Sequence, residues 1–121
     1  MSAIVVYCTV ASIAEARKLT KILVGEKLAA CVSAVPRVHS TYWWQGKIER
    51  GNETLLIIKT QAAKFNALAR RIKALHSYTV PEILALPVVK GNPDYLKWIT
   101  ESLSQSLPPL WGKARMGGRS R

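Results

Sequence analysis

The stretch that decides the fold is ACVSAVPRVHSTYWWQGKIERGNETLLIIKT, residues 30–60. It contains two runs rich in β-branched and aromatic residues, 30–44 and 53–60, with Gln45-Gly46-Lys47 between them. Such runs are typical of strands, and a short glycine-containing interruption is typical of a hairpin turn. We therefore predict one long β-hairpin near the middle of the chain.

Upstream of this hairpin, the pattern predicts a strand followed by a helix. Residues 3–10 form a continuous apolar run, which indicates a strand covered on at least one face. Ser12 and Glu15 match a capping box, in which both side chains satisfy amide groups at a helix start. The helix is expected over residues 12–28, with an apolar face made of Ala16, Leu19, Leu23 and Leu28.

Downstream of the hairpin, a second helix and a short strand are predicted. Residues 61–76 carry apolar side chains at helical spacing, and residues 82–87 form an apolar run bracketed by prolines, as at a sheet edge. Asn92 and Pro93 then indicate a last helix, because Asn is a good N-cap and Pro fits the first helical position.

The order of these elements predicts an α+β fold. A βαββαβ order is the split βαβ pattern of ferredoxin-like domains, which have an antiparallel sheet with helices on one face. Here it is joined by a long hairpin and an extra C-terminal helix. Residues 1–103 are expected to form this domain, and residues 104–121, rich in Ser, Gly and basic residues, are expected to form a flexible basic tail.

The hairpin is too long for its own domain. Sixteen residues from 30 to 45 would span about 50 Å, whereas the radius of gyration of such a domain is about 14 Å. Tyr42 and Trp44 point to one face of the projecting strand and Trp43 to the other, so a lone chain would expose aromatic surface. Self-association is the simplest remedy, and the alternative is a bend near Pro36 that folds the hairpin over its own sheet.

Charge and composition limit the partners. The chain has 18 Lys and Arg against seven Asp and Glu, and removing residues 113–121 lowers the formal charge from +11 to +7 (14 basic minus seven acidic). A basic ferredoxin-like sheet is reminiscent of RNA-recognition modules, but the first strand has Tyr7 without their aromatic-rich basic motif, so no nucleic acid is expected.

The compartment follows from what the sequence contains. The first residues have neither the basic region nor the cleavage site of a signal peptide, and no apolar run is long enough to cross a membrane. We expect a cytoplasmic protein with no membrane association. Cys8 and Cys31 lie in apolar stretches, so we expect buried thiols rather than a disulfide.

Several segments in order resemble the divalent-cation tolerance (CutA) family. They are residues 28–32 (LAACV), 40–48 (STYWWQGKI), 56–60 (LIIKT), 76–83 (HSYTVPEI) and 92–99 (NPDYLKWI). The resemblance covers residues 5–99, with departures at Ser33, Ser77 and Thr79. It implies a homotrimer similar to the PII signal-transduction proteins, with binding of copper or another divalent cation.

Cys31, His76 and Glu82 are the candidate metal ligands, because thiolate and imidazole suit copper and a carboxylate adds negative charge. The topology puts Cys31 at the opposite end of the sheet from His76 and Glu82, so we expect them to meet only across a subunit boundary. The alternatives are a small buried side chain for Cys31 and, for His76, an imidazolium at a helix end.

Glu53, Lys59 and Tyr78, with Glu82, are the candidate residues of an intersubunit pocket, because a lysine ending an apolar strand needs a partner. The alternative for Lys59 is an ion pair with a carboxylate at a strand end. Tyr42, Trp43 and Trp44 are the candidate trimer interface. Packing, rather than a role as a ligand platform, is expected for Tyr42, Trp44, Tyr95 and Trp98.

No motif of a known enzyme class is present, so we do not expect an enzyme. The first hypothesis is a trimeric copper-binding protein of metal-ion tolerance. The alternative is a PII-like signalling protein that binds a small molecule between subunits.

Overall fold

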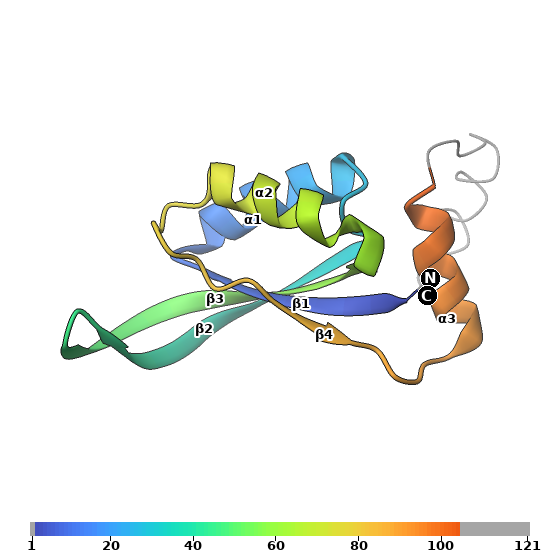
Figure 1. Ribbon diagram of the computed structural model, residues 1–121. Helices are drawn as coiled ribbons and strands as arrows, with labels where there is room; N and C mark the ends of the chain where they lie inside the picture. Colours follow the sequence, from blue (N-terminus) through green and yellow to red (C-terminus); the bar gives the residue numbers. More distant parts are fainter. Residues whose placement is uncertain (1, 105–121) are drawn as a thin grey trace.

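The computed structural model describes residues 2–104 and confirms the predicted fold. Four strands form one antiparallel sheet in the order β2-β3-β1-β4, as in a ferredoxin-like domain. Helices α1 and α2 cover one face of this sheet, and α3 lies at the end where the chain begins (Figure 1). The elements are β1 (Ala3–Val10), α1 (Ile13–Gly25), β2 (Cys31–Trp44), β3 (Lys47–Gln61), a 3-10 turn η1 (Ala62–Lys64), α2 (Phe65–Leu75), β4 (Leu84–Pro87) and α3 (Pro93–Ser102).

Helix α1 begins as predicted and ends earlier than predicted. Ser12 Oγ accepts a hydrogen bond from Glu15 N–H at 3.1 Å, which caps the helix. The helix ends at Gly25 rather than near residue 28, because Lys27 adopts a left-handed conformation with φ of 59°. The N–H groups of Leu28 and Ala29 then bond to the carbonyl of Leu23, which closes the helix end.

The later elements differ from expectation only at their boundaries. The segment expected as one helix over 61–76 starts with η1 and becomes α-helical at Phe65, and the last strand starts at Leu84 rather than 82. Helix α3 begins as predicted, since Asn92 Oδ1 accepts from Asp94 N–H at 2.9 Å and Pro93 occupies the first turn.

The core lies between the sheet and the two covering helices. Alternate residues of β1 and β3 face α1 and α2, so the side chains of one sheet face are buried while the opposite face is not. Cys8 is among the buried residues, as expected for a structural thiol. The largest fully buried side chains include Leu19, Leu23, Leu56, Ile58, Leu68 and Ile72.

Strands β2 and β3 project beyond the helices as a two-stranded arm, residues 38–53 (Figure 1). The arm ends in a two-residue turn in which Gln45 and Gly46 have φ of 51° and 80°, as in a type I′ turn. A bulge separates Val35 from Val38, where the bend near Pro36 was considered. The exposed fractions of Tyr42, Trp43 and Trp44 are nevertheless 46%, 72% and 43%. The arm is therefore not folded onto its own sheet.

The sheet face opposite α1 and α2, which we call the open face, also carries apolar side chains. Tyr7, Leu84 and Leu86 are 37%, 56% and 44% exposed. In the sheet, Tyr7 lies opposite Ile57 of β3 and Leu84 of β4, and Leu86 lies opposite Val5 of β1.

Two further expectations concern the C-terminal tail and membrane association. The tail expected over 104–121 lies outside the described residues from 105 onward, so that prediction and the boundary at 103 stay open. Among residues 2–104, no helix has the length and apolar character needed to cross a membrane.

Candidate functional site

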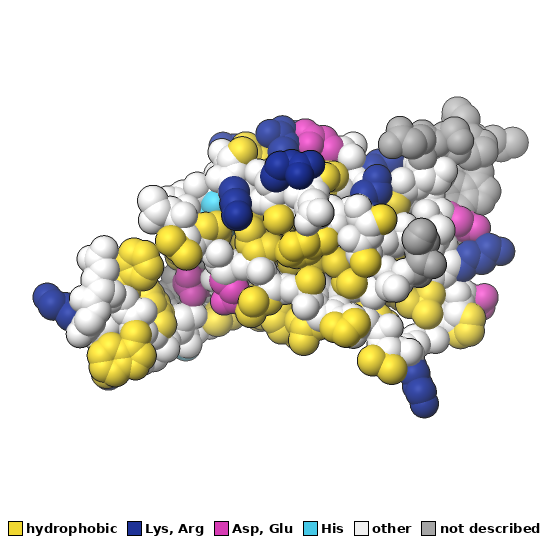
Figure 2. All heavy atoms as spheres, in the orientation of Figure 1, with side chains coloured by type: hydrophobic (Ala, Val, Ile, Leu, Met, Phe, Trp, Pro, Cys, Tyr) yellow, Lys and Arg dark blue, Asp and Glu magenta, His cyan; other side chains and the backbone are white. Residues whose placement is uncertain are grey.

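A cleft of about 720 Å³ lies between the arm and the loop that follows α2, and we call it the arm cleft. Tyr42 and Trp44 line it from the arm, whereas Trp43 does not, as their predicted alternation requires. Figure 2 shows acidic side chains where the projecting arm joins the body. The lining residues are Thr9, Ser40, Thr41, Tyr42, Trp44, Glu53, Ser77, Tyr78, Thr79, Val80 and Glu82.

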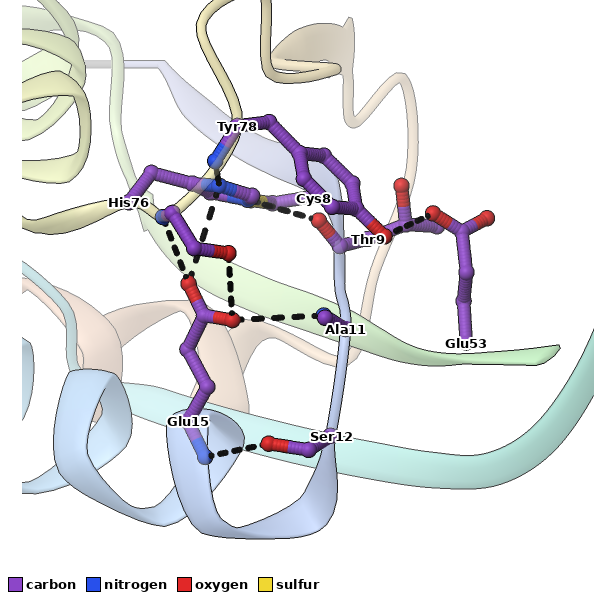
Figure 3. Close-up of polar contacts among 9 residues, drawn as sticks. Cys8, Thr9, Ala11, Ser12, Glu15, Glu53, His76 and Tyr78 are labelled. Carbon is purple, nitrogen blue, oxygen red and sulfur yellow. Dashed lines mark hydrogen bonds and ion pairs between the residues drawn. The ribbon is translucent and has the colours of Figure 1, made fainter. Parts of the chain in front are cut away.

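The two walls of the cleft are joined by one hydrogen bond. Tyr78, in the loop after α2, donates its hydroxyl hydrogen to Glu53 of β3 at 2.8 Å (Figure 3). Burial, followed by the hydrogen bond to Glu53 and the negative charge of that carboxylate, raises the pKa of Tyr78 above its ordinary value. Tyr78 is therefore a neutral donor that fixes the position of the carboxylate.

His76 attaches the start of the same loop to β1. Its Nε2 lies 2.8 Å from the carbonyl oxygen of Thr9, and its Nδ1 accepts a hydrogen bond from Tyr78 N–H at 2.9 Å (Figure 3). A carbonyl only accepts, so Nε2 carries the proton and the ring is the neutral Nε2–H tautomer. The side chain is fully buried, so His76 acts here as a structural residue.

Glu15 joins the start of α1 to this loop. Its carboxylate accepts from the N–H and hydroxyl of Ser77, each at 2.9 Å, and from Ala11 N–H at 3.3 Å. Burial opposes its ionisation, but the hydrogen bonds from Ser77 and Ala11 outweigh burial and lower the pKa of Glu15. The Glu15 carboxylate thus ties the residue before the α1 cap to the loop and orients Ser77 at the cleft.

The cleft is negatively charged. Glu53 and Glu82 line it, and Glu15 lies directly behind Ser77. The field of these groups reaches the core: burial first, then the charges of Glu82, Glu15 and Glu53, raise the pKa of the Cys8 thiol to about 12. Cys8 is consequently protonated and unreactive at neutral pH.

The three predicted metal ligands do not come together within one chain. In the sheet, Cys31 of β2 lies opposite Lys59 of β3, and Lys59 lies opposite Val5 of β1. His76 instead contacts the carbonyl oxygen of Thr9, further along β1. Val5 and Thr9 are separated by roughly 13 Å along β1. Glu82 lines the arm cleft, so it lies on the side of His76, and both ring nitrogens of His76 are engaged. The described residues contain no group of three His, Cys, Asp or Glu placed to hold a metal ion.

The predicted pocket residues are also divided. Glu53 and Tyr78 are hydrogen-bonded in the cleft, whereas Lys59 lies six residues further along β3, which is roughly 20 Å. Lys59 Nζ donates to Ser33 Oγ at 2.9 Å and lies 3.9 Å from Cys31 Sγ. Its partners on the open face are thus a hydroxyl and a thiol rather than the carboxylate of the alternative prediction.

Several residues of the cleft were not predicted. Ser40 and Thr41 occur in the resembling segment around the aromatic residues, and Ser77 and Thr79 were noted only as departures from it. Thr9 carried no signal, because its role depends on where the end of α2 meets β1. The lining offers carboxylates, hydroxyls and aromatic rings, a combination suited to binding and orienting a ligand.

Comparison with known proteins identifies the family. Residues 4–102 match the family model described as "CutA1 divalent ion tolerance protein". The divalent-cation tolerance protein CutA of Thermus thermophilus is 51% identical over 98 residues, covering 81% of this chain and 95% of that protein. Protein CutA 1, chloroplastic, of Oryza sativa is 47% identical over 103 residues, covering 85% of this chain but only 58% of the rice protein.

Solved structures agree with these matches. CutA1 from Oryza sativa superposes with a TM-score of 0.84 at 45% identity, covering 88% of this chain and 97% of that one. The Thermus thermophilus structure gives a TM-score of 0.79 at 50% identity, covering 80% and 94%. With the matched fold, the ordered motifs and nearly the whole domain covered, the chain belongs to the CutA1 divalent ion tolerance family.

Proposed function

We propose that the protein acts in divalent-cation tolerance as a homotrimeric, PII-like protein that binds a small molecule in the arm cleft. The role in tolerance is supported by the family and by the names of the relatives. The observation that carries the proposal is the cleft itself. Its volume of about 720 Å³ is within the range of ligand sites, and the Tyr78–Glu53 hydrogen bond holds its two walls together.

Two apolar surfaces support assembly from several copies. On the arm, Trp43 and Ile48 are 72% and 59% exposed, and on the open face Leu84 is 56% exposed. Contiguous exposed apolar surface on a small protein marks an interface, and equal copies presenting equal surfaces form closed symmetric assemblies. One chain keeps Lys59 apart from Glu53 and Tyr78, so this member of the predicted pocket set would reach the cleft only from a neighbouring copy.

Light scattering tests the assembly. The expected mass is about three times the 13.4 kDa of one chain, and Trp43→Ala is expected to shift the distribution towards smaller species. The matched control is Val24→Ala, since Val24 is 40% exposed on α1, outside both surfaces. A wild-type protein that remains a monomer at tens of micromolar would contradict the trimer.

Ligand binding in the cleft is tested separately, with a panel of nucleotides and small metabolites in thermal-shift assays of the trimer. A binder is expected to lose its effect in Trp44→Leu, because Trp44 lines the cleft. The effect should be retained in Trp98→Phe, since Trp98 stacks on Tyr95 in α3. Binding that is equal in both variants would place the ligand elsewhere.

Copper binding is a second candidate, favoured by the position of Cys31. The thiol is partly exposed on the open face rather than buried, where a neighbouring copy would bring further donors. Cys31, Glu82 and His76 remain the predicted ligands, and Cys31 would have to come from a different copy than the other two. For His76, binding would also break its hydrogen bond to Thr9 or Tyr78.

A competition titration with Cu(I) on the assembled protein tests this second candidate. Cys31→Ser is expected to weaken copper binding by at least about tenfold, with His39→Ala in the arm as the control. Unchanged affinity in Cys31→Ser would remove the thiol from the site.

A cytoplasmic location stays a prediction, because the rice relative is called chloroplastic and the Archaeoglobus fulgidus structure is called periplasmic.

A further inference from the structure

The charge of the arm cleft is opposite to the charge of the protein. The chain carries 18 Lys and Arg against seven Asp and Glu. Among the described residues, however, the cleft lining contains two carboxylates, Glu53 and Glu82, and no lysine, arginine or histidine. A third carboxylate, Glu15, lies behind Ser77. Clefts lined by one sign of charge concentrate ligands of the opposite sign.

Aromatic rings stand beside these carboxylates. Tyr42 and Trp44 come from the arm and Tyr78 from the opposite wall, so aromatic surface is present on both sides of the cavity. Ring faces attract ammonium and guanidinium groups, and this attraction grows when the cation is removed from water. Anions are disfavoured by the same ring faces and by the carboxylates.

The arrangement does not suit a bare metal ion. Glu53 is on β3 and Glu82 is on the segment before β4, and the described residues bring no three His, Cys, Asp or Glu together as a ligand set. Two carboxylates from different elements, beside aromatic walls, instead suit a cation with spatial extent. The hydroxyls of Ser40 and Thr79 would serve polar groups attached to such a cation.

We infer that the arm cleft binds a small organic cation, in which an ammonium or guanidinium group lies between Glu53, Glu82 and the rings of Tyr42 and Trp44. This inference rests on the proposed ligand-binding role of the cleft and names the class of its ligand. The ligand enters as a free small molecule, since the cleft has the volume of a metabolite site and opens to solvent beside the arm.

Calorimetry with a matched pair of probes tests the inference on the assembled, full-length protein. Choline carries a quaternary ammonium, and 3,3-dimethylbutan-1-ol has the same shape without the charge. Choline is expected to bind at least about tenfold more tightly than the alcohol. Glu82→Gln is expected to reduce this preference, whereas Glu26→Gln, which removes the same charge from an exposed pair with Arg71, should leave it unchanged.

Each other outcome overturns the inference in a recognisable way. Equal binding of choline and the alcohol, or tighter binding of pyrophosphate that is lost in Trp44→Leu, would show a ligand cleft without cation selectivity. The proposed function would then stand. If Lys59→Met binds choline and the wild type does not, Lys59 of a neighbouring copy occupies the cleft of the wild-type protein and excludes the cation. Absence of binding by both probes in wild type and Lys59→Met rejects the organic cation, and failure of the wider metabolite panel also rejects the ligand-binding function.

Discussion

Tyr78 and Glu53 share a hydrogen bond of 2.8 Å, although they lie 25 positions apart in the sequence. Through it, the loop after α2 is attached to β3 at the base of the arm. The contact belongs to a larger group of polar contacts, because the N–H of Tyr78 is bonded to His76, whose ring is bonded to Thr9. The position of the cleft wall therefore depends on a few identifiable bonds.

Replacing Tyr78 with Phe is expected to destabilise the protein by about 1.5 kcal/mol, because a hydrogen bond to a charged acceptor is lost while the ring is kept. Urea denaturation measures the change. Tyr7→Phe is the control, since Tyr7 lies on the open face away from Glu53. Equal stability of Tyr78→Phe and wild type would contradict this, because water would then hydrogen-bond the Glu53 carboxylate as well as the Tyr78 hydroxyl does.

Replacing His76 with Ala is expected to cost about 2–3 kcal/mol in the free energy of unfolding, because it leaves the Thr9 carbonyl and the Tyr78 N–H without their partner in a buried setting. The exposed His39, which contacts Asn52 at 2.7 Å, provides the control His39→Ala with a smaller expected loss. Nitrogen NMR of the imidazole should show the Nε2–H tautomer at pH 7.5, and the Nδ1–H tautomer would contradict the assignment.

The carboxylate of Glu15 should make stability depend on pH in the acid range. Its pKa in the folded protein lies below the ordinary value of 4.5, so its contribution is complete above that value and is lost as the pH falls through the folded pKa. Denaturation between pH 6 and pH 3 should show a flatter profile for Glu15→Gln than for wild type. The exposed Glu26, as Glu26→Gln, should change the profile less, because its ion pair is screened by water.

The turn of the arm should be sensitive to a single methyl group. Gly46 has φ of 80°, where an L-residue is strained although nothing lies within 4 Å of a Cβ. Gly46→Ala is expected to cost about 1 kcal/mol and to speed amide hydrogen exchange in the arm. At Gly51 the nearest atom to a Cβ would be Tyr42 Oη at 3.9 Å, so Gly51→Ala should be tolerated. Equal exchange in both variants would contradict the role of Gly46.

The elements were predictable because their signals are local. The capping serine at residue 12 and the Asn92-Pro93 pair are recognised from adjacent residues, and both caps are present. The end of α1 was misplaced because Leu28 continues the apolar spacing, while the conformation that stops the helix belongs to Lys27. A lysine carries no signal for a left-handed conformation, in contrast to glycine or asparagine.

The site was only partly predictable, because its contacts join distant parts of the chain. The aromatic alternation of the arm correctly separated Tyr42 and Trp44 from Trp43. Lys59 was grouped with Glu53 because a lysine that ends an apolar strand needs a partner, yet the rise of the strand keeps the two residues apart. The bond from Glu15 to Ser77 spans 62 positions, and it depends on how α1 and α2 are placed on the sheet.

The bulge in β2 lets the two halves of that strand pair with β3 in opposite phases. Between the pairs Val35↔Leu55 and Val38↔Glu53, β2 has two residues where β3 has one. That single surplus residue reverses the odd-even phase of β2: odd positions such as Cys31 share a face with Lys59, whereas along the arm even positions share a face with Glu53. A chain lacking Arg37 would form the same pairs as a regular ladder, with Tyr42 and Trp44 still on the face of Glu53, but it would lose the bend and the added twist that the bulge gives to the base of the arm.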